Sequence, residues 1–161
     1  MKAMTMHSRK ILCRQRGVAA VEFALVFLLF ISVLYGAATF GAVFYTQQVL
    51  SRAAEDGARA ISLLGVTPLV TNDPQITSVV YNSLESSLIA PATLGSTQAV
   101  RKTWIENPAN VVVAIDPTCA GVTGCVKVTV QYQYSQNRIL PVLPLISWAP
   151  NTLTASAIAP K

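Results

Sequence analysis

Charged residues are scarce in this sequence. They make up 12% of its 161 residues, while 52% of the residues are apolar. An ordinary soluble domain carries about 25% charged residues, so the composition argues against a free cytosolic globule. It also excludes a disordered chain, which combines low hydrophobicity with high net charge.

Histidine is almost absent. The one histidine is His7, in the N-terminal tail, and a mature chain that lost this tail would have none. That excludes Ser-His-Asp and Cys-His catalysis and any histidine-containing zinc site. The sequence also lacks a glycine-rich phosphate loop, a Ser-x-x-Lys pair and a run of liganding carboxylates. We therefore expect no enzyme, no metal site and no cofactor.

Positive charge is confined to one end of the chain. The first 17 residues hold five basic groups and no acid, so they account for the whole net charge of +5. The rest of the chain has seven basic and seven acidic groups. Nucleic-acid binding needs basic groups spread over a folded face, so we expect no nucleic-acid partner.

A long uncharged segment follows the basic tail. From Phe23 to Ser51 there is no charged residue, and about 20 apolar residues are enough to cross a bilayer as a helix. Positive charges stay on the cytoplasmic side. The sequence thus predicts a single-pass protein of the inner (cytoplasmic) membrane, with a cytoplasmic N-terminus and a periplasmic or extracellular C-terminal domain.

The junction between tail and span carries an unexpected acid. Glu22 stands four residues after Val18 and directly before Phe23, with Gly17 closing the basic tail. This arrangement resembles the type IV pilin superfamily. The resemblance implies that a prepilin peptidase cuts between Gly17 and Val18, which makes Glu22 the fifth mature residue. It further implies that Glu22 and Phe23 act in subunit docking, with the carboxylate pairing with the terminal amine of a neighbouring subunit.

Two stretches narrow the resemblance. Residues 17–26 and residues 45–60, which end in Gly-Ala-Arg-Ala, look like the TadE-like family, minor pseudopilins of the tight-adherence (Tad) type IVc pilus system. The resemblance implies a minor pilin that acts in assembly of a Tad (Flp-type) pilus for adhesion. Its expected partners are the prepilin peptidase, other Tad pilins and pseudopilins, inner-membrane pilus assembly proteins and the lipid bilayer. Major Tad pilins are much shorter, which disfavours that role.

Two other interpretations stay open. Phe23–Tyr35 is also compatible with an ordinary signal core, followed by small residues at 36–38 as a cleavage site. The protein would then be an exported or singly membrane-anchored periplasmic binding protein. That interpretation leaves Glu22 and the continuing apolar run unexplained. A type II secretion pseudopilin would share the processing chemistry but not the Gly-Ala-Arg-Ala segment.

The helix is expected to continue past the span. Apolar or small residues recur at helical spacing up to Leu64 and define one packing face. Arg52 with Asp56 and Glu55 with Arg59 stand four residues apart, a spacing that predicts two helical ion pairs. The expected organisation is a basic leader at 1–17, a transmembrane and amphipathic helix at 18–64, and a periplasmic or extracellular α+β domain at 65–161.

The C-terminal region has its own periodicity. Asp73 and Pro74 are typical of a helix start, and Pro91 is expected to end that helix. Strands are predicted where apolar and polar residues alternate or where a short apolar run occurs. An irregular loop is expected at 139–148. The predicted strands are 100–106, 111–116, 126–134 and 153–159. The fold class is therefore α+β, a long N-terminal helix followed by a small domain with an antiparallel sheet packed on it.

Two of the three cysteines are close together. Cys119 and Cys125 lie between the two clearest strands, and in an exported domain they would form a disulfide across a hairpin loop. A redox or metal pair is the alternative, but Cys-x-x-Cys spacing is missing. Cys13 lies in the cytoplasmic leader and is expected to stay reduced.

Overall fold

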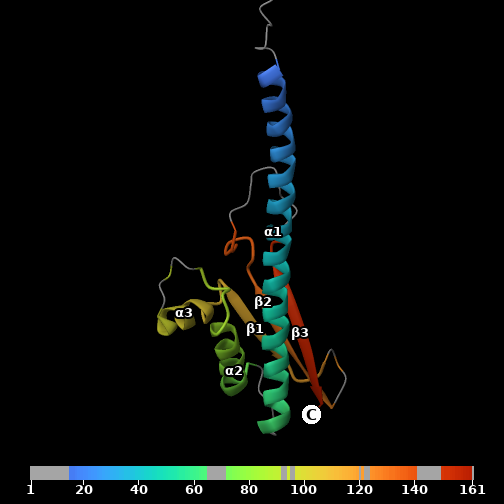
Figure 1. Cartoon of the computed structure of the whole chain (residues 1–161). Coiled ribbons are helices and arrows are strands. Elements are labelled where there is room, and N and C mark those ends of the chain that lie inside the picture. Colours follow the sequence, from blue (N-terminus) through green and yellow to red (C-terminus); the bar gives the residue numbers. More distant parts are fainter. Residues whose placement is uncertain are drawn as a thin grey trace, which may run out of the picture. The chain divides into compact units, whose positions relative to one another are not determined.

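The computed structural model describes residues 15–64, 72–91, 94, 97–119, 121, 124–140 and 150–160. Among these it contains three helices and three strands (Figure 1). The chain divides into two compact units, Met1–Thr39 and Phe40–Lys161. In chain order the elements are α1 (Gln15–Leu64), α2 (Pro74–Glu85), α3 (Gln98–Ile105), β1 (Val111–Asp116), β2 (Cys125–Tyr132) and β3 (Leu153–Pro160).

The described part of the first unit is the N-terminal portion of α1. Its large apolar side chains are exposed on every side of the helix, from Val18 at 69% to Leu34 at 50%. The Ser32 hydroxyl donates to the carbonyl of Leu28 at 2.8 Å, so its polarity is satisfied within the helix. By length and composition α1 is able to cross a membrane. It is the candidate for a single-pass anchor.

The second unit is built on a three-stranded antiparallel sheet in the order β1-β2-β3. Val113 pairs with Val130, and Val128 pairs with Ala157. In β1 buried and exposed residues alternate strictly, apart from the half-buried Asp116 at its end. One face of the sheet therefore carries the core, as predicted for an α+β fold.

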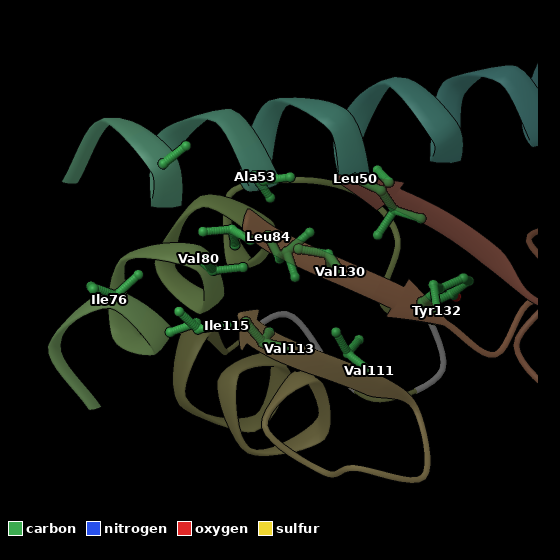
Figure 2. Close-up of a cluster of buried hydrophobic side chains, with 14 of the residues drawn as sticks. Leu50, Ala53, Ile76, Val80, Leu84, Val111, Val113, Ile115, Val130 and Tyr132 are labelled. Carbon is green, nitrogen blue, oxygen red and sulfur yellow. The ribbon is translucent and has the colours of Figure 1, made fainter. Parts of the chain in front are cut away.

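Helices cover the buried face of this sheet. Figure 2 shows side chains of α1 and α2 directed at those of β1 and β2. Leu50 and Ala54 of α1 and Val80 of α2 are fully buried in the same cluster as Val128 and other sheet residues. The apolar face predicted for the helix is thus the packing face, except that Leu64 at its end stays 49% exposed.

Helix α2 starts as predicted but ends earlier. The Asp73 side chain caps it by accepting from the Gln75 backbone N–H at 2.9 Å, and Pro74 occupies the first turn. The helix ends at Glu85 and does not reach Pro91. The Ser87 hydroxyl donates to the Leu84 carbonyl at 2.5 Å, and such side-chain bonds compete with helix continuation.

The strand predicted at 100–106 is wrong, because α3 occupies this segment. Its residues 98–102 include several good helix formers, and only Ile105 is fully buried. Arg101 fixes the helix against the end of α2, since its guanidinium donates to the carbonyl of Glu85 at 2.7 Å and to that of Ser87. This long-range contact is invisible in the local pattern.

The other strands agree with the sequence. β1 has the predicted bounds, and β3 extends one residue further, to Pro160. β2 starts at Cys125 and stops at Tyr132, two residues before the predicted end. The Tyr134 N–H turns back to the Tyr132 carbonyl at 3.0 Å. Most of the predicted loop at 139–148 lies outside the described residues.

At Gly57 α1 lies close to two other core elements. A Cβ added there would lie 2.7 Å from Val80 Cγ2 and 3.2 Å from Val128 Cγ1. Glycine thus allows one helix to contact both α2 and β2 at the same level.

We predict that Gly57→Ala lowers the melting temperature of the protein in detergent. Alanine is about 1 kcal/mol better than glycine in a helix, but overpacking costs about 1–3 kcal/mol. Gly41→Ala is the matched control, because a Cβ there meets nothing within 4 Å. It should leave the melting temperature unchanged or raise it. An equal rise in both variants would contradict the close packing at Gly57.

Tyr132 ties the end of β2 to two other segments. The ring is fully buried. Its hydroxyl hydrogen-bonds the carbonyl oxygens of Asn137 at 2.8 Å and Ile89 at 3.1 Å. Burial raises the pKa of the Tyr132 phenol above its usual value, with a smaller contribution from Tyr134.

This shift predicts a loss of stability at alkaline pH. Above about pH 10 the unfolded chain loses the Tyr132 proton while the folded chain keeps it, so the free energy of unfolding falls as the pH rises. Tyr132→Phe should cost about 1 kcal/mol near neutral pH. The difference from the parent should shrink above pH 10 in denaturant titrations. A difference that stays constant with pH would refute this role.

Candidate processing and assembly segment

Gly17 and Val18 lie in the first turns of α1, which begins at Gln15. Both residues are exposed, and a Cβ at Gly17 would meet nothing within 4 Å. Packing within the described structure therefore does not require glycine at this position. The first backbone N–H groups of a helix have no intrahelical partner, and helix ends fray. The 17–18 peptide bond thus lies near a helix end, where helices commonly fray.

Glu22 follows one turn later, on the same side of the helix as Val18, because residues four apart share a face. Its side chain is exposed, and no salt bridge among the described residues includes it. Phe23 is 70% exposed and stacks on Phe27, with ring centroids 5.8 Å apart. The helix therefore presents one carboxylate and an aromatic pair on an otherwise apolar surface.

Two threonine hydroxyls in the apolar part of α1 are satisfied within the helix. The Thr39 hydroxyl donates to the Tyr35 carbonyl at 2.8 Å, and the Thr46 hydroxyl donates to the Ala42 carbonyl at 2.9 Å. Glu22 differs from them because it is the only charged residue between Gly17 and Ser51. An ionised carboxylate in a dry environment is expensive unless it is paired. If this part of α1 lies in a dry environment, Glu22 therefore needs a partner, and none of the described residues forms a salt bridge with it.

The predicted disulfide is present at the other candidate site. Cys119 and Cys125 are bonded, with their Cα atoms 5.9 Å apart. Gly121 and Gly124 have φ near +97° and +95°, a conformation that favours glycine. The bond closes the connection between β1 and β2. Among the described residues there is no group of three or more His, Cys, Asp or Glu that could hold a metal ion.

The two helical ion pairs predicted in α1 do not form. Among the described residues neither Arg52 nor Arg59 has a carboxylate within 4.0 Å. Asp56 instead accepts a hydrogen bond from the Ser83 hydroxyl of α2 at 2.6 Å. The i, i+4 spacing is correct for both pairs. For Asp56 the neighbouring helix α2 offers a closer partner, whereas Glu55 stays exposed.

Sequence reasoning also missed a groove between α1 and α2. It has a volume of about 650 Å³, and Arg52, Arg59, Leu63, Leu64 and Val79 are among its lining residues. On α1 these residues recur at helical spacing, and this pattern in the sequence could have indicated that they share one strip of the helix surface. The sequence could not show that α2 leaves this strip of α1 uncovered.

Comparison with known proteins agrees with the resemblance found in the sequence. Residues 17–59 match the model of a family described as TadE-like protein. The match lies within α1 and includes Gly17, Val18, Glu22 and Phe23. The recognition of a TadE-like segment is therefore confirmed. No curated protein and no solved structure matches the chain significantly.

Proposed function

We propose, from the TadE-like segment at residues 17–59, that this protein is a minor pilin or pseudopilin of a Tad (Flp-type) pilus. In this proposal it is made as a precursor, inserted in the inner membrane, cut by a prepilin peptidase between Gly17 and Val18, and used in pilus assembly for adhesion. The family match is the observation that carries the proposal.

The position of the cut suits the exposure of α1. An ordinary signal peptidase removes the apolar segment, whereas a cut before Val18 leaves it on the product. Large apolar side chains of the first unit are exposed on every side. Such a surface needs lipid or the helices of other subunits around it, and both are available to a pilin before and after assembly.

Cleavage would create the partner that Glu22 lacks among the described residues. The new terminus at Val18 is an α-amine, with an ordinary pKa of about 7.7–8.0, and is largely protonated at neutral pH. In a dry bundle of helices, pairing this amine with the Glu22 carboxylate of a neighbouring subunit costs much less than burying either charge alone. Only one register along the two helices brings the groups together, so the pair would also set the position of the subunit.

The C-terminal unit would then act by binding other proteins. Its hydrophobic core, its disulfide and the capped helix α2 stabilise a folded domain that includes the α1 residues of the second unit. Other Tad pilins, pseudopilins and inner-membrane assembly proteins are the partners proposed for its surface. Non-enzymatic action is part of the same proposal, since family members of this kind are structural.

The proposal predicts a separation of processing from assembly in Glu22→Gln. This variant keeps the size and the helix but removes the charge, so the peptidase should still cut it. Incorporation into the pilus-associated fraction should fall at least about tenfold, which corresponds to 1.4 kcal/mol. Immunoblots of membrane and sheared-pilus fractions measure both quantities in one experiment.

Glu55→Gln is the matched control, because Glu55 is an exposed carboxylate on the same helix within the second unit. It should behave as the parent in both fractions. Normal incorporation of Glu22→Gln would refute the docking role. Loss of incorporation in Glu55→Gln as well would show that any charge change on α1 disturbs assembly.

A further inference from the structure

The groove between α1 and α2 has a regular construction. The two helices run alongside each other in opposite directions. Leu88, just after α2, donates its N–H to the Tyr45 hydroxyl at 3.2 Å, and Ser83 bonds Asp56 further along. The residues that line the groove on α1 follow the spacing i, i+4, i+7, i+8, i+11 and i+12 from Arg52. They form one straight strip along the helix.

The groove combines apolar walls with positive charge. Leu63 is 79% exposed and Leu64 is 49% exposed, while Val79 is half-buried. Arg52 and Arg59 are exposed, and neither forms a salt bridge among the described residues. The lining acid, Asp56, lies between the two arginines on this strip and accepts a hydrogen bond from the neutral Ser83 hydroxyl, so the groove keeps one more basic than acidic side chain. The groove thus offers two guanidinium groups and, beyond Arg59 along α1, the apolar side chains of Leu63 and Leu64.

We propose that this groove binds an amphipathic helix of another protein that carries two carboxylates seven residues apart, with apolar residues on the same face beyond one of them. Arg52 and Arg59 are themselves seven residues apart, which is two turns, or about 10.5 Å at 1.5 Å per residue. A helix laid along the groove would place its apolar stripe on Leu63 and Val79, and its carboxylates against the two arginines. This is the helix-in-groove mode of recognition.

The charge pattern excludes a second copy of this chain as the occupant. No two of its acids are seven residues apart in the sequence; they are Glu22, Glu55, Asp56, Asp73, Glu85, Glu106 and Asp116. The segment 65–71, which joins α1 to α2, contains no acid at all. The complementary helix must therefore come from a different protein. This inference rests on the second unit alone and does not depend on processing at Gly17.

A charge-swap binding experiment on the full-length protein in uncharged detergent micelles tests the proposal. The probe is a fluorescein-labelled synthetic helix with leucines on one face and two glutamates seven residues apart. The comparison peptide has lysines at those two positions. Fluorescence anisotropy gives the Kd of each. The glutamate peptide should bind about tenfold more tightly than the lysine peptide, and the ratio should shrink in about 0.5 M salt.

Variants identify the arginines as the cause. Arg52→Gln with Arg59→Gln should abolish the preference, and Arg52→Glu with Arg59→Glu should reverse it. Lys127→Gln is the control, because Lys127 lies on β2, outside the residues that line the groove. It should keep the tenfold ratio. Both arginines are exposed, so melting curves should match the parent and show that the variants are folded.

Three outcomes would overturn the proposal. Equal binding of the two peptides to the parent would show that binding does not depend on the charge of the peptide. A preference that survives Arg52→Glu with Arg59→Glu would place the binding elsewhere. Failure of both peptides to bind would show that the groove does not accept a helix, as expected if the chain's own residues fill it.

Discussion

A single helix has to satisfy two different surroundings, and the rest of the structure follows from that constraint. In the first unit α1 exposes apolar side chains on every side, from Val18 onward. In the second unit the same helix buries one face only, with Leu50, Ala54 and Ile61 in the core. Hydrophobic burial is non-directional, so it does not decide which residue of α1 meets which neighbour. The features that decide these contacts have another source. They come from the few polar and small residues that interrupt the apolar pattern.

Gly57 and Glu22 are two such interruptions, one in each unit. At Gly57 the missing side chain lets α1 meet Val80 and Val128 together, which fixes how α1, α2 and the sheet pack. At Glu22 an added charge has no partner among the described residues. The first residue defines a contact inside the subunit. The second, in the proposed function, defines a contact between subunits.

The sequence predicts best where one local pattern decides the outcome. The apolar run of β1 predicts its bounds correctly, and Asp73 with Pro74 predicts the start of α2. The resemblance at residues 17–59 is carried by residue types at fixed spacing and is confirmed. The disulfide also follows from local position, since Cys119 and Cys125 flank a short connection between paired strands.

Prediction fails where a distant residue decides the outcome. The strand predicted in the segment of α3 overlooks the helix formers at 98–102, and the contacts of Arg101 with the end of α2 are not visible in any local pattern. Spacing predicts an ion pair of Arg52 and Asp56, but Ser83 lies 27 positions away in the sequence and takes the carboxylate. The groove between α1 and α2 was missed for the same reason. Its existence depends on how two helices approach each other.

The N-terminal residue and intact mass of the protein, isolated from membranes with and without the prepilin peptidase, test the central claim most directly. The account predicts a chain that starts at Val18 and keeps the whole apolar helix, and a full precursor when the peptidase is absent. A start near Thr39, or an uncut Met1 in both samples, would contradict it. The protein would then be an exported or anchored domain whose Glu22 has no role in assembly.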